Sequence, residues 1–151
     1  SGIKNNRFPV TWHTARFNNE RDLEIYRRAV ELWIKEKKRL EYDDLPEYLK
    51  THNNRTAFVD RFKVVAADLP AAHTVLAHLA KDGHYYIHPD IKQNRSITPR
   101  EAARLQTFPD DYFFEGVTEK PSRAAAFRQI GNAVPVLLAR KIAEKLKEKW
   151  I

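Results

Sequence analysis

Residues 98–101 read Thr-Pro-Arg-Glu, a sequence that combines three signals for the start of a helix. The hydroxyl of Thr98 is placed to accept a hydrogen bond from the amide of residue 101, and the carboxylate of Glu101 to accept one from the amide of Thr98. Pro99 takes the first helical position, where its missing N–H costs nothing. The sequence therefore predicts a helix near 98–107.

Two longer stretches repeat apolar side chains at the period of a helix. The first spans residues 23–34 and follows Asn18 and Asn19, either of which can cap a helix start. The second spans residues 135–149, where lysines gather at the C-terminal end and are favoured there by the helix dipole. The sequence predicts a helical N-terminal part and a C-terminal helix near 135–149.

Residues 73–79 and 84–88 are two apolar runs typical of strands. They flank Asp82-Gly83, and Asp-Gly is a strong signal for a two-residue hairpin turn. We therefore expect a small antiparallel sheet with a hairpin near 73–88. With the predicted helices, this gives an α+β fold class.

The chain is basic, with a formal net charge of +7 and a pI of about 9.7. Such a balance favours an anionic partner, most simply nucleic acid. Since no apolar run approaches the roughly 18 residues of a membrane span, no membrane partner is expected.

The sequence contains no cysteine, which excludes disulfides, thiolate metal sites and thiol nucleophiles within this chain. His84 and His88 would share a face of the predicted strand, with His78 opposite, but their spacing matches no standard zinc pattern. A polar, half-exposed hairpin is the preferred interpretation, and no metal site is predicted.

Two blocks of sequence go beyond generic structure. Residues 95–110 read Arg-Ser-Ile-Thr-Pro-Arg-Glu-Ala-Ala-Arg-Leu-Gln-Thr-Phe-Pro-Asp, and residues 128–135 read Arg-Gln-Ile-Gly-Asn-Ala-Val-Pro. In this order, and followed by an apolar helix, they resemble motifs IX and X of the DNA (cytosine-5) methyltransferases. Many members of that family have a second proline where this chain has Val136.

The segment before these blocks resembles the end of the family's target recognition domain. It reads Thr-Val-Leu-Ala-His at 74–78, followed by Lys-Asp-Gly at 81–83. The resemblance covers residues 58–146 well. It covers residues 1–57 weakly, and residues 13–65 resemble a bacterial subgroup of that domain more loosely.

The resemblance implies that residues 1–92 are part of the target recognition domain and residues 93–151 a C-terminal methyltransferase segment. Its last helix would complete a Rossmann-like domain. The family transfers a methyl group from S-adenosylmethionine to C5 of a cytosine flipped out of duplex DNA. Its cofactor loop and its Pro-Cys nucleophile loop lie N-terminal to the recognition domain. We therefore expect a C-terminal fragment that is inactive alone.

The resemblance also assigns roles to residues. Each assignment has a simpler alternative: Asn132 is only a helix cap, the DNA candidates are ordinary surface charges, and the residues of the helix near 98–107 lie on a solvent-exposed amphipathic helix. Cofactor contact is predicted for Asn132, Ala133 and Val134. DNA contact is predicted for Thr74, Lys81, His84, Arg61 and Lys63. A scaffolding role is predicted for Arg100, Glu101, Arg104 and Gln106. Gly131 is expected to permit backbone angles that a side chain would block, in a tight turn at 131–135.

The expected partners are duplex DNA and an N-terminal catalytic half or subunit, in the cytoplasm of a bacterium. A second copy of the chain, paired through an exposed C-terminal helix, is also expected. The alternative is a stand-alone DNA-binding or regulatory module, which differs in that no N-terminal partner would restore methyl transfer. An RNA-binding module is disfavoured because no aromatic-rich RNA signature is present.

Overall fold

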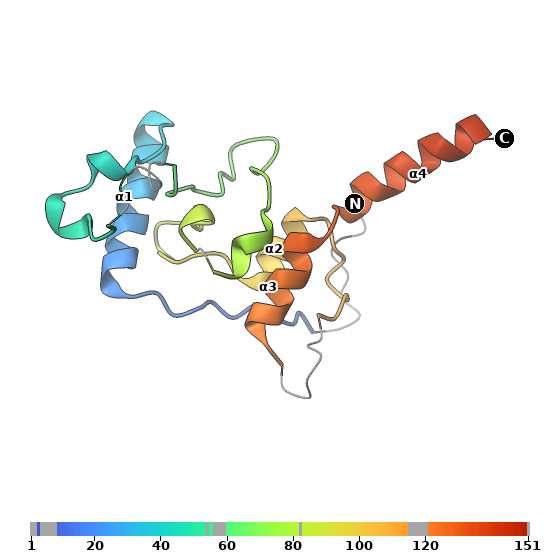
Figure 1. Cartoon of the computed structure of the whole chain (residues 1–151), viewed down its shortest axis with the longest axis horizontal. Helices are drawn as coiled ribbons and strands as arrows, with labels where there is room; N and C mark the ends of the chain where they lie inside the picture. The colour runs from blue at the N-terminus through green and yellow to red at the C-terminus, as the bar shows by residue number, and fades with distance from the viewer. Residues whose placement is uncertain are drawn as a thin grey trace. The chain divides into compact units, whose positions relative to one another are not determined.

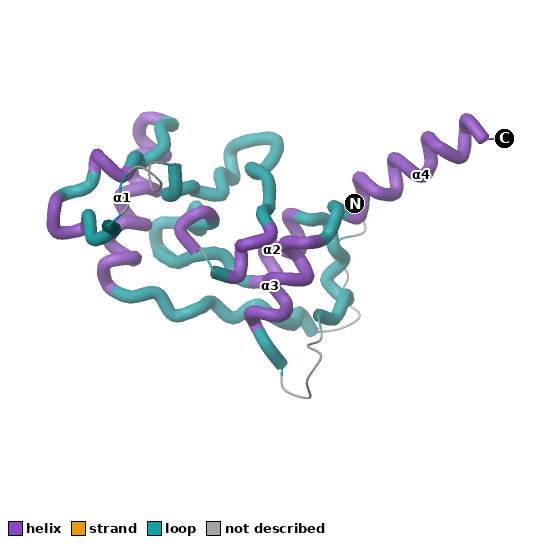
Figure 2. Tube along the Cα trace, viewed as in Figure 1, coloured by secondary structure: helices purple, strands orange, loops and turns teal. Residues whose placement is uncertain are grey.

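The computed structural model describes residues 3, 9–53, 55, 60–81, 83–114 and 121–150. These residues are helical or irregular, without an extended strand (Figures 1 and 2). The α-helices are α1 (Glu20–Glu36), α2 (Pro99–Leu105), α3 (Arg123–Asn132) and α4 (Val136–Trp150). The 3-10 helices are η1 (Tyr42–Asp44), η2 (Glu47–Leu49), η4 (Ala77–Ala80) and η5 (Gly83–Tyr85).

The chain forms two compact units whose segments alternate along the sequence. Unit 1 comprises residues 1–14, 74–81 and 98–151. Unit 2 comprises residues 15–73 and 82–97.

Helix α1, which the sequence predicted, contributes one buried face to the core of unit 2. Its N-cap is Asn19, whose side chain accepts from the amide of Asp22 over 2.9 Å. It ends at Lys37, which takes a left-handed conformation and donates to the carbonyl of Trp33. One face of the helix is buried and includes Ile25 and Val30. Full burial of an isoleucine or valine side chain contributes about 1.5–3 kcal/mol to folding. The core of the unit is completed by Leu40, Tyr42, Leu45, Leu49, Phe62 and Ile87.

Isolated bridges stand in unit 2 where a sheet was expected. Ile87 pairs in parallel with Val64 and antiparallel with Ser96. The hairpin prediction for 73–88 was wrong in the described residues, because 3-10 helices η4 and η5 replace its strands. The two arms of the expected hairpin belong to different units, so each packs into its own core and tertiary packing overrides local strand preference.

Helix α2 of unit 1 forms with the predicted capping box. The amide of Glu101 donates to the Thr98 hydroxyl over 3.2 Å, and the Thr98 amide donates to the Glu101 carboxylate over 2.8 Å. Pro99 is the first residue of the helix. This local prediction is confirmed at the level of individual hydrogen bonds.

Helix α3 was not predicted, and it changes the explanation for Gly131. This glycine lies within the last turn of α3, not in a tight turn. A Cβ atom at Gly131 would lie 2.8 Å from the carbonyl oxygen of Leu76 and 3.1 Å from the Cα atom of Ala77. Glycine is therefore needed for the close approach of α3 and η4, and the connection to α4 starts only at Ala133.

Helix α4 confirms the predicted C-terminal helix. None of its residues is buried. Leu138, Ile142 and Leu146 follow each other at every fourth position and are 49%, 50% and 51% exposed. In the described part of the chain, no helix is both long enough and apolar enough to cross a membrane.

Candidate functional site

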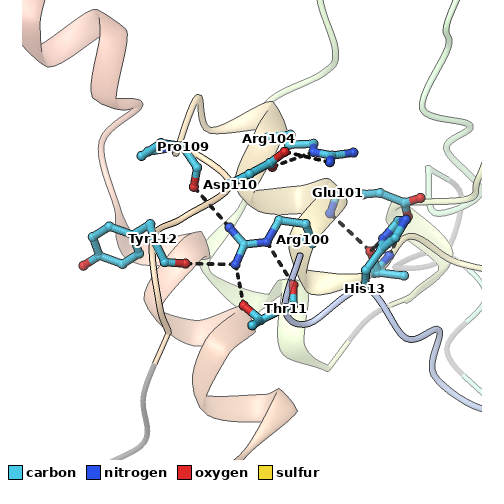
Figure 3. A network of polar contacts seen from close by, with 9 residues as sticks. Thr11, His13, Arg100, Glu101, Arg104, Pro109, Asp110 and Tyr112 are labelled. Carbon is cyan, nitrogen blue, oxygen red and sulfur yellow. Dashed lines mark hydrogen bonds and ion pairs between the residues drawn. The ribbon is translucent and has the colours of Figure 1, made fainter. Parts of the chain in front are cut away.

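Arg100 lies completely buried at the centre of a hydrogen-bond network in unit 1 (Figure 3). Its guanidinium donates to the carbonyl and the hydroxyl of Thr11 over 3.0 and 2.8 Å. It also donates to the carbonyl oxygens of Pro109 and Tyr112 over 3.1 and 2.9 Å. Burial lowers the pKa of Arg100, opposed by the nearby Asp110 carboxylate, although an arginine remains protonated in proteins. Arg100 therefore fastens two loop segments to α2.

Arg104 pairs with Asp110 in a two-pronged ion pair (Figure 3). Nε lies 2.8 Å from Oδ1, and Nη2 lies 2.9 Å from Oδ2. The Asp110 side chain is only 2% exposed, and this hydrogen bond is the main cause that raises the pKa of Arg104. Paired parallel hydrogen bonds of this kind fix orientation as well as distance, so the loop after α2 has a defined course.

Gln106 connects the end of α2 to the connection between α3 and α4. Its side-chain amide donates to the carbonyl oxygens of Ile130 and Ala133 over 3.1 and 3.0 Å. The backbone carbonyl oxygen of Gln106 accepts from the backbone amide of Val136 over 3.1 Å. These three bonds hold both ends of the connection.

Thr107 completes this arrangement. Its hydroxyl accepts from the amide of Leu137 over 2.9 Å, and its φ of 60° is uncommon for a β-branched residue. The first turn of α4 is thus capped in part by residues from the end of α2.

The three predicted cofactor residues lie at this connection. Asn132 ends α3 and is exposed, and Val134 is 61% exposed. Ala133 is half-buried, and its carbonyl is held by Gln106. The chain therefore exposes an amide side chain and an apolar side chain on a backbone that Gln106 holds by hydrogen bonds.

Three of the predicted DNA-binding residues lie in unit 2. The ammonium of Lys63 is 4.7 Å from the centre of the Tyr85 ring, and the guanidinium carbon of Arg61 is 5.6 Å from it. His84 is less accessible, because its ring packs edge-on against Phe62 with centroids 5.5 Å apart. Its Nε2 atom lies 3.9 Å from a carboxylate oxygen of Asp22.

The other two DNA candidates, Thr74 and Lys81, lie in unit 1 on either side of η4, and both are exposed. Sequence reasoning missed Tyr85, whose ring is shared by two cations, and Asp60, which accepts from Lys63 over 2.9 Å. No short-range pattern marks either residue. Over the residues that the structure describes, His, Asp and Glu side chains form no group of three or more that could hold a metal ion.

Comparison with known proteins places these features in a family. The model of the C-5 cytosine-specific DNA methylase family matches residues 6–148. The Type II methyltransferase M.Bpa9945I of Bacillus paralicheniformis is 53% identical over 138 residues, which are 91% of this chain and 29% of that protein. The Type II methyltransferase M.AgeI of Thalassovita gelatinovora is 47% identical over 90 residues, 60% of this chain and 19% of that protein.

A plant protein also matches. DNA (cytosine-5)-methyltransferase 1B of Oryza sativa subsp. japonica is 40% identical over 104 residues, 69% of this chain and 6% of that protein. The chain thus spans less than a third of the length of these curated relatives. No solved structure gives a significant match. Because the family model spans nearly all of it, the chain belongs to the C-5 cytosine-specific DNA methylases.

Proposed function

We propose that this chain is the target-recognition and C-terminal part of an enzyme that methylates C5 of cytosine in duplex DNA. Family membership and the net charge of +7 support this. The reaction proceeds through attack by a thiolate, and this chain contains no cysteine. The nucleophile must therefore come from another part of the enzyme, and the chain alone is inactive.

S-adenosylmethionine would meet this chain at the connection between α3 and α4, with the ligand supplying the methyl group. The observation that supports this proposal is the pair of hydrogen bonds from the Gln106 side chain to the carbonyl oxygens of Ile130 and Ala133. A ligand with polar and apolar parts suits a site that offers both kinds of group on a rigid backbone. Asn132 and Val134 would contact it through their exposed side chains, and Ala133 through its backbone. The three form one wall of the pocket.

In this proposal, residues 1–92 belong to the DNA-binding part and residues 93–151 to the methyltransferase segment. Arg61, Lys63 and Lys81 would neutralise backbone phosphates. Thr74 and His84 would contact the duplex as hydrogen-bonding groups. A scaffolding role, without contact to the ligands, would fall to the residues that hold α2 and the segments bonded to it in place: Arg100, Glu101, Arg104 and Gln106.

Helix α4 would pack against the catalytic part of the enzyme and complete its Rossmann-like domain. Its apolar stripe of Leu138, Ile142 and Leu146 is half exposed, and burying such a stripe on a partner is favourable by roughly 25 cal/mol for each Å² of apolar surface. The curated relatives are more than three times as long as their match to this chain, so in them a partner for such a helix is available within one polypeptide.

The test mixes this chain with the N-terminal part of the Bacillus paralicheniformis relative and follows transfer of labelled methyl groups to duplex DNA. We expect transfer by the mixture and none by either part alone. Salt-dependent binding of duplex DNA by this chain is measured in parallel. Binding without restored transfer would favour the stand-alone module, and absence of both would refute the proposal.

A further inference from the structure

The carboxylate of Asp60 joins two cations that come from different parts of unit 2. Its Oδ2 atom accepts from the ammonium of Lys63 over 2.9 Å, and its Oδ1 atom accepts from the guanidinium of Arg39. Arg39 follows the end of α1, and Lys63 lies between the two bridging residues Phe62 and Val64. Two cations thus converge on a single anion.

Two of the three charged side chains are accessible to an external ligand. Arg39 and Asp60 are 49% and 55% exposed, whereas Lys63 is 17% exposed. Arg39 and Lys63 also line one hollow of about 80 Å³, together with Trp33 and His73. Such a hollow has room for several water molecules, and the cluster keeps a net positive charge.

We infer that Arg39 and Lys63 form a binding site for one phosphate of the DNA backbone, and that Asp60 occupies the place of this phosphate until DNA binds. The inference rests on the proposed DNA-binding function and adds two residues, Arg39 and Asp60, to it.

The chemistry of the two anions supports such an exchange. A carboxylate and a phosphodiester each carry one negative charge over two acceptor oxygens, so either can satisfy an arginine and a lysine together. Exposed ion pairs are weak because water and salt screen them, so a phosphate can displace Asp60. Displacement opposes binding equally for every DNA sequence, because a phosphate carries no base information. Asp60 would thereby lower non-specific affinity and increase the share of binding that comes from base contacts.

His73 provides a second readout of the same cluster. Burial is the main cause that lowers the pKa of its imidazole, and the hydrogen bond to the Tyr85 carbonyl opposes it. Lys63 and Arg39 lower this pKa further, whereas Asp60 raises it. Neutralising Asp60 should therefore lower the pKa of His73, and a bound phosphate should raise it again.

The experiment compares duplex DNA binding by the 151-residue chain and its variants over a series of salt concentrations. We expect Asp60→Asn to tighten binding by about three- to tenfold. The matched control is Glu47→Gln, because Glu47 also bridges two cations, Lys50 at 3.0 Å and Arg55 at 3.3 Å. It makes the same change in net charge, and we expect a change in affinity below about twofold.

The double variant Arg39→Gln/Lys63→Gln tests whether these two cations bind the phosphate. It should bind more weakly, and its slope of log affinity against log salt should be shallower by about 0.9 for the one phosphate lost. Adding Asp60→Asn in this background should change affinity no more than the Glu47 control does. In the chain with both cations intact, NMR titration of His73 should show its pKa lowered by Asp60→Asn and raised again by DNA.

The outcomes separate this inference from the proposed function. If Glu47→Gln tightens binding as much as Asp60→Asn, or if Asp60→Asn keeps its full effect without Arg39 and Lys63, the inference is wrong and DNA binding stands. If the unchanged chain binds no duplex DNA at low salt, both are wrong. Thermal unfolding of each variant shows whether the fold is kept.

Discussion

The side-chain amide of Gln106 donates to the backbone carbonyl of Ala133, 27 residues further along the chain, over 3.0 Å. A second bond from the same nitrogen reaches Ile130. The side chain of Gln106, the residue that follows α2, therefore holds the backbone of the proposed cofactor site in place.

Gln106→Leu should lower the free energy of unfolding by about 1–3 kcal/mol, because it removes the side-chain hydrogen bonds to the carbonyl oxygens of Ile130 and Ala133. Urea denaturation measures this. Arg128→Leu, at an exposed position of α3, should cost less than about 0.5 kcal/mol. Equal costs for the two variants would argue against a special role for Gln106.

Gly131→Ala should destabilise the chain by about 1–3 kcal/mol, even though alanine is the better helix former. The added Cβ would meet backbone atoms of η4, which cannot move aside as a side chain can. Gly83→Ala is the control, since its nearest contact is the hydroxyl end of Tyr26 at 3.1 Å. A stabilised Gly131→Ala variant in thermal unfolding would show that α3 and η4 approach less closely than described.

Arg100→Met should cost about 3 kcal/mol, because it removes four hydrogen bonds that a completely buried guanidinium donates to two loop segments. Arg100→Lys should recover only part of this loss, since an ammonium cannot reproduce the planar fork of the guanidinium. Arg128→Met, at an exposed position of α3, serves as the control in the same denaturation series. Full recovery by lysine would mean that charge, and not geometry, is what this site requires.

His73 should make stability depend on pH. Its pKa in the folded chain is lowered below the ordinary value of about 6.5, so the unfolded chain binds the proton more readily. The stabilisation is therefore present above about pH 6.5 and is lost as the pH falls through the lower, folded pKa. His73→Gln keeps a donor for the carbonyl of Tyr85 and should flatten this loss. Denaturation at a series of pH values would reveal parallel curves if the prediction were wrong.

Leu138→Glu combined with Ile142→Glu should abolish association of α4 with the N-terminal catalytic part and leave the stability of this chain unchanged within about 0.5 kcal/mol. The reason is that these side chains are half exposed here and would be buried only on a partner. Arg140→Gln with Glu144→Gln changes the paired charges of the same helix and should leave association intact. Sedimentation of the mixture measures both, and also shows whether the chain alone pairs with a second copy.

The parts of the fold that were predictable are those fixed by neighbours in sequence. The capping box of Thr98 and Glu101, the Asn19 cap and the apolar stripe of α4 all act within a few residues. The hairpin prediction was wrong because Leu79 is buried in unit 1. Its segment therefore packs into that core and does not pair with residues 84–88. The local Asp-Gly signal contains no information about that competition.

The candidate site was predictable as a set of residues but not as a mechanism of support. Motif resemblance pointed to Gln106 and Asn132 separately, while the bonds between α2 and the α3–α4 connection span 24 and 27 residues. Helix α3 was missed because Gly131 reads locally as a turn residue, and only its packing on η4 explains a glycine in that helix. Asp60 and Arg39 are 21 residues apart, so no local pattern relates them.

The alternation of the two units along the chain has a consequence for protein engineering. Residues 15–73 and 82–97 form unit 2, while 74–81 return to unit 1 between them. No single cut in the polypeptide yields both units whole. A graft that aims to transfer the unit 2 of a relative into this chain must therefore replace two separate blocks and retain the eight-residue segment that lies between them.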